Sequence, residues 1–139
     1  MTIVDLTGVA ITEILAFPAV TAIVGPRVRG EFASGEGPPA VIVESLAIDY
    51  SPMGRTRRAR LQAPIFAAKC YHLTRPGCSQ LANAVVESME LRGPRRGTGN
   101  RLVYLSLVTS GGDVVLEPVT NRLVATVIFT LVGAQAAVA

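Results

Sequence analysis

The sequence contains no tryptophan, and aromatic side chains of all kinds make up only 5% of its 139 residues. A hydrophobic core therefore has to be built from aliphatic side chains, and these are plentiful, since half of the residues are apolar. Charged residues are correspondingly few, at 17%. Such a chain can offset its conformational entropy by burial, which excludes an intrinsically disordered protein. We expect a single domain over residues 1–139, with 133–139 as a flexible tail.

Histidine and cysteine are also scarce: the chain has one histidine, His72, and two cysteines, Cys70 and Cys78. A histidine-based hydrolase would have to use His72, and no Gly-x-Ser-x-Gly elbow accompanies it. We interpret His72 as a residue at the end of a strand and keep a cryptic hydrolase as the weakest alternative. The three side chains could form a partial zinc site, but a closed structural site needs four ligands. We therefore expect no enzymatic activity, no metal and no cofactor, and the cysteine usage indicates a reducing compartment.

The mean hydropathy is nonetheless +0.44, which is high for a small domain. Residues Leu123 to Ala139 carry no charge, a run at the short end of what spans a membrane as a helix. The first half of this run is rich in β-branched residues, so we predict a buried strand with a small-residue tail rather than a membrane anchor. The N-terminal stretch has no basic region and contains Asp5 and Glu13, unlike a secretory signal. Surplus apolar surface then indicates an oligomer interface.

The apolar pattern predicts helices near the N-terminus and in the middle of the chain. Residues 1–25 are expected to be helical, with a break at Pro18 and an end at Gly25. A second helical region is expected from a cap at Thr74 to about Glu90. Its core-facing side chains recur every four residues, at Leu81, Val85 and Met89.

Alternating segments predict strands over 27–29, 40–50, 56–71, 102–109, 114–117 and 121–132. Pro64 within one of them suggests an edge or a bulge, and Gly111-Gly112 predicts a hairpin turn. Loops are expected over 30–39 and 92–100. In the last strand one face is apolar, and we take its side chains as core or subunit-interface candidates: Leu123, Val127, Phe129 and Leu131. The fold class is α+β, a single antiparallel-rich mixed sheet of about four to five strands with two or three helices on one face.

Positive charge is concentrated in two segments, and twelve of the thirteen basic residues are arginine. The first cluster consists of Arg55, Arg57, Arg58 and Arg60; the second basic loop consists of Arg92, Arg95, Arg96 and Arg101. No acidic residue occurs between Asp49 and Glu87, so one region should be distinctly positive. Two interpretations stay open: a solvated turn, or contacts with phosphate or with acidic residues of a partner. The arginines are not interleaved with aromatics, which disfavours base stacking.

The order of several segments resembles the tail terminator (tail completion) proteins of tailed bacteriophages. These segments are Phe17–Val28, Pro38–Val43 after a proline-rich loop, the long strand Arg60–Tyr71, the helix with Leu81–Val85, and the last strand Leu123–Leu131. The resemblance implies a structural virion protein, a homohexameric ring that caps the head-proximal end of the tail tube, stops tube polymerisation and docks to the head connector. It also implies the major tail tube protein and a head completion protein as partners, and a location in the virion neck, with the host cytoplasm during assembly.

A ring that passes DNA should not be acidic inside, and the Arg55–Arg60 turn is a candidate lining that would favour phosphate without reading bases. Two alternatives remain. One is a head completion (stopper) or connector protein of the neck. The other, from a different class, is a small nucleic-acid-binding domain that uses the same arginines.

Overall fold

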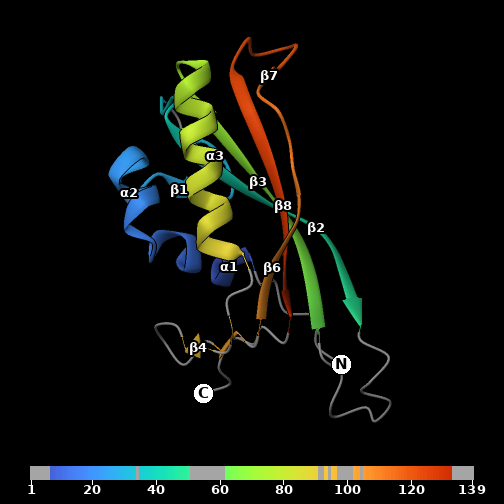
Figure 1. The fold of residues 1–139 in the computed structure, drawn as a ribbon. Coiled ribbons are helices and arrows are strands. Elements are labelled where there is room, and N and C mark those ends of the chain that lie inside the picture. Colours follow the sequence, from blue (N-terminus) through green and yellow to red (C-terminus); the bar gives the residue numbers. More distant parts are fainter. Residues whose placement is uncertain are drawn as a thin grey trace.

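The computed structural model describes residues 7–33, 35–50, 62–90, 93, 95–96, 102–103 and 105–132. The helices are α1 (Thr7–Leu15), α2 (Pro18–Val24) and α3 (Arg75–Met89). The strands are β1 (Val28–Arg29), β2 (Ala40–Tyr50), β3 (Gln62–His72), β4 (Arg95–Arg96), β5 (Leu102–Val103), β6 (Leu105–Gly111), β7 (Val115–Leu116) and β8 (Leu123–Val132). This is the predicted α+β class, with long strands set apart from the helices (Figure 1). The tail 133–139 lies outside the described residues.

The main sheet has six strands in the order β1-β2-β3-β8-β6, with β7 pairing to β8 beyond the end of β6. All its pairings are antiparallel except that of β1 with β2. β4 and β5 form a separate two-stranded antiparallel sheet. The helices pack against one face of the main sheet, with α3 running along it and α1 and α2 beside α3 (Figure 1). The prediction of helices on one face is therefore confirmed.

The core lies between the helices and this face of the sheet. Phe66 of β3 and Phe129 of β8 stack at its centre, with ring centroids 5.5 Å apart. Val127 and Leu131 on the same face of β8 are also buried, and Leu123 packs against the edge of the core. The alternation predicted for the last strand thus matches the face that packs against the helices.

Helix α3 begins and packs as its local sequence predicts. The hydroxyl of Thr74 accepts a hydrogen bond from the backbone N–H of Gly77 at 3.1 Å, which satisfies one of the free donors of the first turn. Leu81, Val85 and Met89 are fully buried against the sheet. The cap and the four-residue spacing are both confirmed.

The helical N-terminal region is divided where proline and glycine require it. Pro18 occupies the first turn of α2, where its missing N–H costs nothing. The chain leaves α2 at Gly25, whose φ of 61° lies in the left-handed region. Both predicted boundaries are confirmed.

The hairpin predicted at Gly111-Gly112 is wrong. β6 and β7 do not pair with each other; both pair with β8, and the N–H of Gly112 donates to the carbonyl of Thr126 at 2.8 Å. The glycines therefore lie between two strands, β6 and β7, that follow one another along the same neighbour, β8. The chain reverses later, between Glu117 and Arg122, where Asn121 has a φ of 53°. The glycine pair carries the local signal for a turn, but the available partner strand determines the pairing.

Pro64 lies in an interior strand rather than at an edge, because β3 is flanked by β2 and β8. Its position is still special, since the β3–β8 register ends one residue later, at Ile65. Proline has no N–H to extend that ladder, and its carbonyl instead accepts a hydrogen bond from the hydroxyl of Thr130 at 2.8 Å. The irregularity occurs on the facing strand, where Leu46 is inserted between Ser45 and Ala47 of β2.

The loop between β1 and β2 reaches the sheet face that carries no helix. Phe32 of this loop packs against a small second cluster formed by Ile42, Tyr71 and Val124. The rings of Phe32 and Tyr71 meet edge to face, with centroids 5.0 Å apart. One end of this face is therefore covered by loop rather than helix.

Candidate functional site

The first arginine cluster lies outside the described residues. It belongs to the segment between β2 and β3 and consists of Arg55, Arg57, Arg58 and Arg60. The described residues that flank this segment are Tyr50 and Gln62, which pair with each other. The hypothesis that these arginines form a basic lining stays a prediction from sequence.

The second basic segment is described only in part. Arg95 and Arg96 form β4 and pair with Val103 and Leu102 of β5, whereas a loop was expected over 92–100. A Gly/Pro/Arg stretch carries no strand pattern, so the short pairing comes from the neighbouring apolar strand and not from local propensity. The other two members, Arg92 and Arg101, lie outside the described residues.

A polar cluster links the turn before β8 to the far face of the sheet. The hydroxyl of Tyr71 donates to Oε2 of Glu117 at 2.8 Å, and the hydroxyl of Thr120 donates to Oε1 at 2.6 Å. These two hydrogen bonds hold the pKa of Glu117 below its usual value, and the bond from Thr120 has the larger effect. The pKa of Tyr71 is raised well above its ordinary value. Desolvation is the largest cause, and the hydrogen bond to Glu117 is the second. The carboxylate is therefore held as an ionised acceptor that fixes the turn.

The guanidinium of Arg122 completes this cluster by lying over the ring of Phe32, 4.3 Å from its centroid. Phe32 also contacts Tyr71 of β3. The β1–β2 loop and the turn before β8 therefore meet at the end of β3. Sequence patterns did not indicate this cluster, since its aromatic residues are isolated and its charges are spread over the chain. The arrangement orders loops and contains no nucleophile beside a base.

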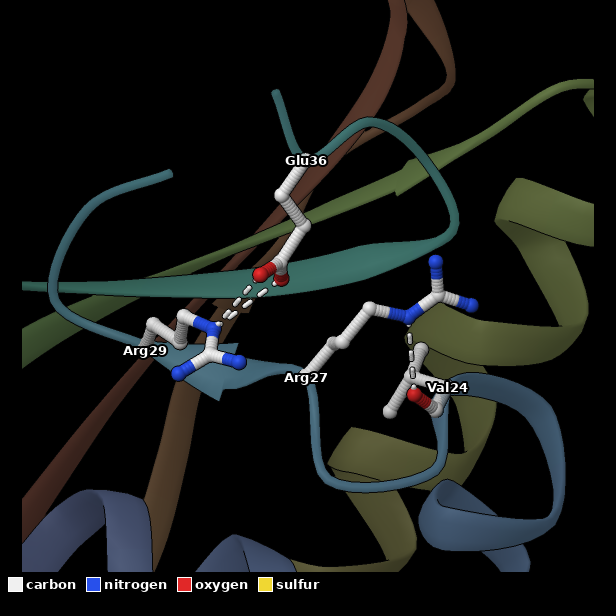
Figure 2. Close-up of polar contacts among 4 residues, drawn as sticks. All are labelled: Val24, Arg27, Arg29 and Glu36. Carbon is white, nitrogen blue, oxygen red and sulfur yellow. Dashed lines mark hydrogen bonds and ion pairs between the residues drawn. The ribbon is translucent and has the colours of Figure 1, made fainter. Parts of the chain in front are cut away.

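Two arginines on either side of Val28 contact the segments that flank β1 (Figure 2). Nε of Arg27 donates to the carbonyl of Val24 at 3.2 Å, next to the end of α2. Nε of Arg29 lies 3.0 Å from both carboxylate oxygens of Glu36, which closes the loop on itself. An open hollow on the surface is lined by residues 28–33. Because both arginines are engaged at Nε, we interpret them as loop anchors rather than as a free cationic site.

His72 and the two cysteines lie near the start of α3, but they do not form a ligand set. Nδ1 of His72 accepts a hydrogen bond from the N–H of Thr74 at 3.3 Å. Cys70 and Cys78 are both free and fully buried, and the thiol of Cys78 donates to the carbonyl of Leu123 at 3.3 Å. Within the described part of the chain, no three His, Cys, Asp or Glu side chains are grouped as a metal site would require.

Large apolar side chains are exposed at two places on the described surface. Leu46 of β2 is 53% exposed. The others lie around β7, at the end of the sheet where β3 ends: Leu73, Val115, Leu116 and Val119. Val119 is the most exposed of them, at 93%. Isolated exposed aliphatics are normal, but a group at one end indicates a surface that contacts another molecule.

No single helix in the described ranges is long and apolar enough to cross a membrane. Only α1 and α2 taken together reach that length and composition, and they are bent by 90° at their junction. The charge-free run that begins at Leu123 is strand β8 as far as Val132.

Comparison with known proteins gives a structural likeness and no sequence match. No protein-family model matches the chain, and no curated protein matches its sequence. Among solved structures, the fold is similar to a chain from the virion of a native gene transfer agent (GTA) particle, with a TM-score of 0.63 at 12% identity. The match covers 91% of this chain and 92% of that chain. Thus the chain shares its fold, over nearly its whole length, with a component of a virion particle.

Proposed function

We propose that this protein is a structural component of a phage-like virion. The observation that carries the proposal is the structural match to the GTA particle chain, which spans about nine tenths of both molecules. The described surface is in keeping with assembly, because its polar clusters order loops and its exposed aliphatic side chains are grouped.

Within the virion, we assign the chain to the tail terminator position. Six copies form a ring at the head-proximal end of the tail, contact the major tail tube protein on one side and a head completion protein on the other, and pass DNA without reading its sequence. The resemblance of the N-terminal helices, the long strand and the last strand to tail terminator proteins supports this assignment. The exposed group around β7 supplies an apolar surface, and a ring of identical subunits joins each such surface to a different one on the neighbouring copy.

Deleting the gene from a particle-producing strain and imaging the products by electron microscopy tests the assignment. Loss of a terminator should give tail tubes of unregulated length together with heads that lack tails. Loss of a head completion protein should instead give tails of normal length beside unjoined heads, which would support the neck alternative. Normal particles would contradict both.

The purified chain gives a second test. A terminator should form a stable oligomer near six times the chain mass of 14.6 kDa, unchanged by a chelator and requiring no nucleotide. A monodisperse monomer at about tens of micromolar, measured by analytical ultracentrifugation, would contradict the ring.

The nucleic-acid-binding alternative rests on the first arginine cluster, which contains four arginines in six positions. It predicts binding to free duplex DNA whose affinity falls steeply with salt. Replacing Arg55, Arg57, Arg58 and Arg60 with Gln should then reduce the salt slope. Absence of DNA retention at low salt in a filter-binding assay would eliminate this alternative.

A further inference from the structure

The main sheet leaves two long strand edges without a neighbour among the described residues. On one side, β1 pairs with β2 only at Val41 and Ile42, so that no described strand lies beside β2 from Val43 to Tyr50. On the other side, β6 is the last strand, and β8 is its only described partner. Each open edge presents backbone N–H and C=O groups that a further strand could bind.

The two open edges lie at the same height in the sheet. Followed across β3 and β8, the register places Val43 of β2 level with Gly111 of β6, and Ala47 level with Leu107. β1 covers β2 only next to this stretch, level with Ala125 and Thr126 of β8, and β7 pairs with β8 further on, at Val124 and Leu123. A neighbouring copy at the same height therefore brings open β2 beside open β6 without a slide along the strands.

Each edge carries one bulge, at Leu46 in β2 and at Thr109 in β6, but neither has a lysine or a proline between Val43 and Tyr50 or between Leu105 and Gly111. β6 has the sequence Leu-Ser-Leu-Val-Thr-Ser-Gly, with no charge and no proline. On β2, the exposed Glu44 is paired within the chain to Lys69 at 3.2 Å. Natural edge strands are commonly protected by lysine or proline. Two edges of one sheet that both lack lysine and proline indicate that both are covered in the assembled state.

We propose that the open edge of β6 pairs with the open edge of β2 of a second copy, so that the sheets of neighbouring subunits join into one. β2 and β6 run in opposite directions within the chain, since three antiparallel pairings separate them. Copies related by rotation about an axis along the strands therefore pair antiparallel. The two edges are different surfaces, and such a heterologous contact closes into a ring when the rotation allows it. The inference rests on the proposed ring and identifies its contact.

The geometry identifies one outward N–H on each edge. The N–H of Gly112 donates inward to Thr126, so that of Gly111 points to the open side. The N–H of Val41 donates outward to Arg27, so that of Ser45, four residues on, also points outward. Gly111→Pro and Ser45→Pro each remove one outward donor. Gly111→Ala and Ser45→Ala are matched controls that keep it; a Cβ on Gly111 meets no atom within 4 Å, and Ser45 is exposed.

Sedimentation velocity of these variants tests the pairing. Each proline variant should weaken self-association by about tenfold to a hundredfold, while each alanine variant assembles like the wild type. A mixture of the two proline variants should give a dimer and nothing larger, because the Gly111→Pro chain keeps its β2 edge and the Ser45→Pro chain keeps its β6 edge. Proline variants that fold and still assemble like the wild type would overturn this contact and leave the proposed ring standing. A monomeric wild type would overturn both.

Hydrogen exchange on the unmodified chain keeps the test independent of variant folding. Amides in 107–111 and 43–45 should exchange more slowly in the oligomer than after dilution to monomer. Equal exchange in the two states would overturn the pairing, even if the proline variants failed to fold.

Discussion

The imidazole ring of His72 occupies the space that a side chain on Gly77 would need. A Cβ at position 77 would overlap three atoms of the ring, including Nδ1. The same Nδ1 accepts the N–H of Thr74, the residue that caps α3. The one histidine of the chain therefore contacts the junction between β3 and α3, and this contact rather than the backbone angle disfavours a side chain at position 77.

We predict that Gly77→Ala destabilises the protein, by about 1–3 kcal/mol in the free energy of unfolding. Helix propensity alone would favour alanine by about 1 kcal/mol, so a loss would show that the overlap with His72 dominates. Urea unfolding followed by circular dichroism measures the difference.

The double variant His72→Ala/Gly77→Ala is the control for this contact. Without the ring, alanine at position 77 should be neutral or stabilising relative to His72→Ala alone. A double-mutant cycle without coupling between the two positions would contradict the overlap as the cause.

Glu117 predicts a defined pH dependence of stability. Its pKa is lowered in the folded chain by the hydroxyls of Thr120 and Tyr71. The ionised form therefore stabilises the fold above the unfolded-state pKa, and this contribution is lost as the pH falls through the folded-state value. Glu117→Gln should lower the free energy of unfolding at pH 7, and the difference from the wild type should shrink as the pH falls from about 6 to about 3. A difference that stays constant over this range would contradict the assignment.

The parts of the fold that sequence predicted are those determined by local pattern. The cap at Thr74, the break at Pro18 and the alternation along β8 each depend on residues within a few positions of one another. The hairpin at Gly111-Gly112 failed because β6 and β7 both pair with β8, a later strand that a local turn signal does not specify.

The polar cluster on the far face shows the same limit for a candidate site. Tyr71 and Glu117 are 46 positions apart, and Phe32 joins them only because the β1–β2 loop crosses to the face without helices. None of these residues belongs to a motif. The arginine clusters, by contrast, are obvious in sequence, but charge density alone does not indicate which surface they form.

The two cysteines should be unreactive in the folded protein. Both are fully buried, and burial raises the pKa of Cys70 to about 12 and that of Cys78 above its usual value. Since the thiolate is the reactive form, labelling with a disulfide reagent at pH 8 should be at least about a hundredfold slower in the native chain than in denaturant. Cys70→Ala and Cys78→Ala chains measured separately assign each rate, and fast labelling of either thiol in the native chain would contradict its placement.

The hydroxyl of Thr130 should stabilise the point where β3 leaves β8. It is nearly buried and donates to the carbonyl of Pro64, where the missing N–H of proline ends the ladder. Thr130→Val keeps the shape and leaves that carbonyl without its donor, so we predict a loss of about 1–3 kcal/mol in the free energy of unfolding. Valine is otherwise at least as favourable as threonine in a strand, so a lower free energy of unfolding would be due to the lost hydrogen bond. Thr130→Ser keeps the hydroxyl, so its free energy of unfolding should fall by less than that of Thr130→Val, by about the contribution of one methyl group. A valine variant as stable as the wild type would show that this carbonyl needs no donor.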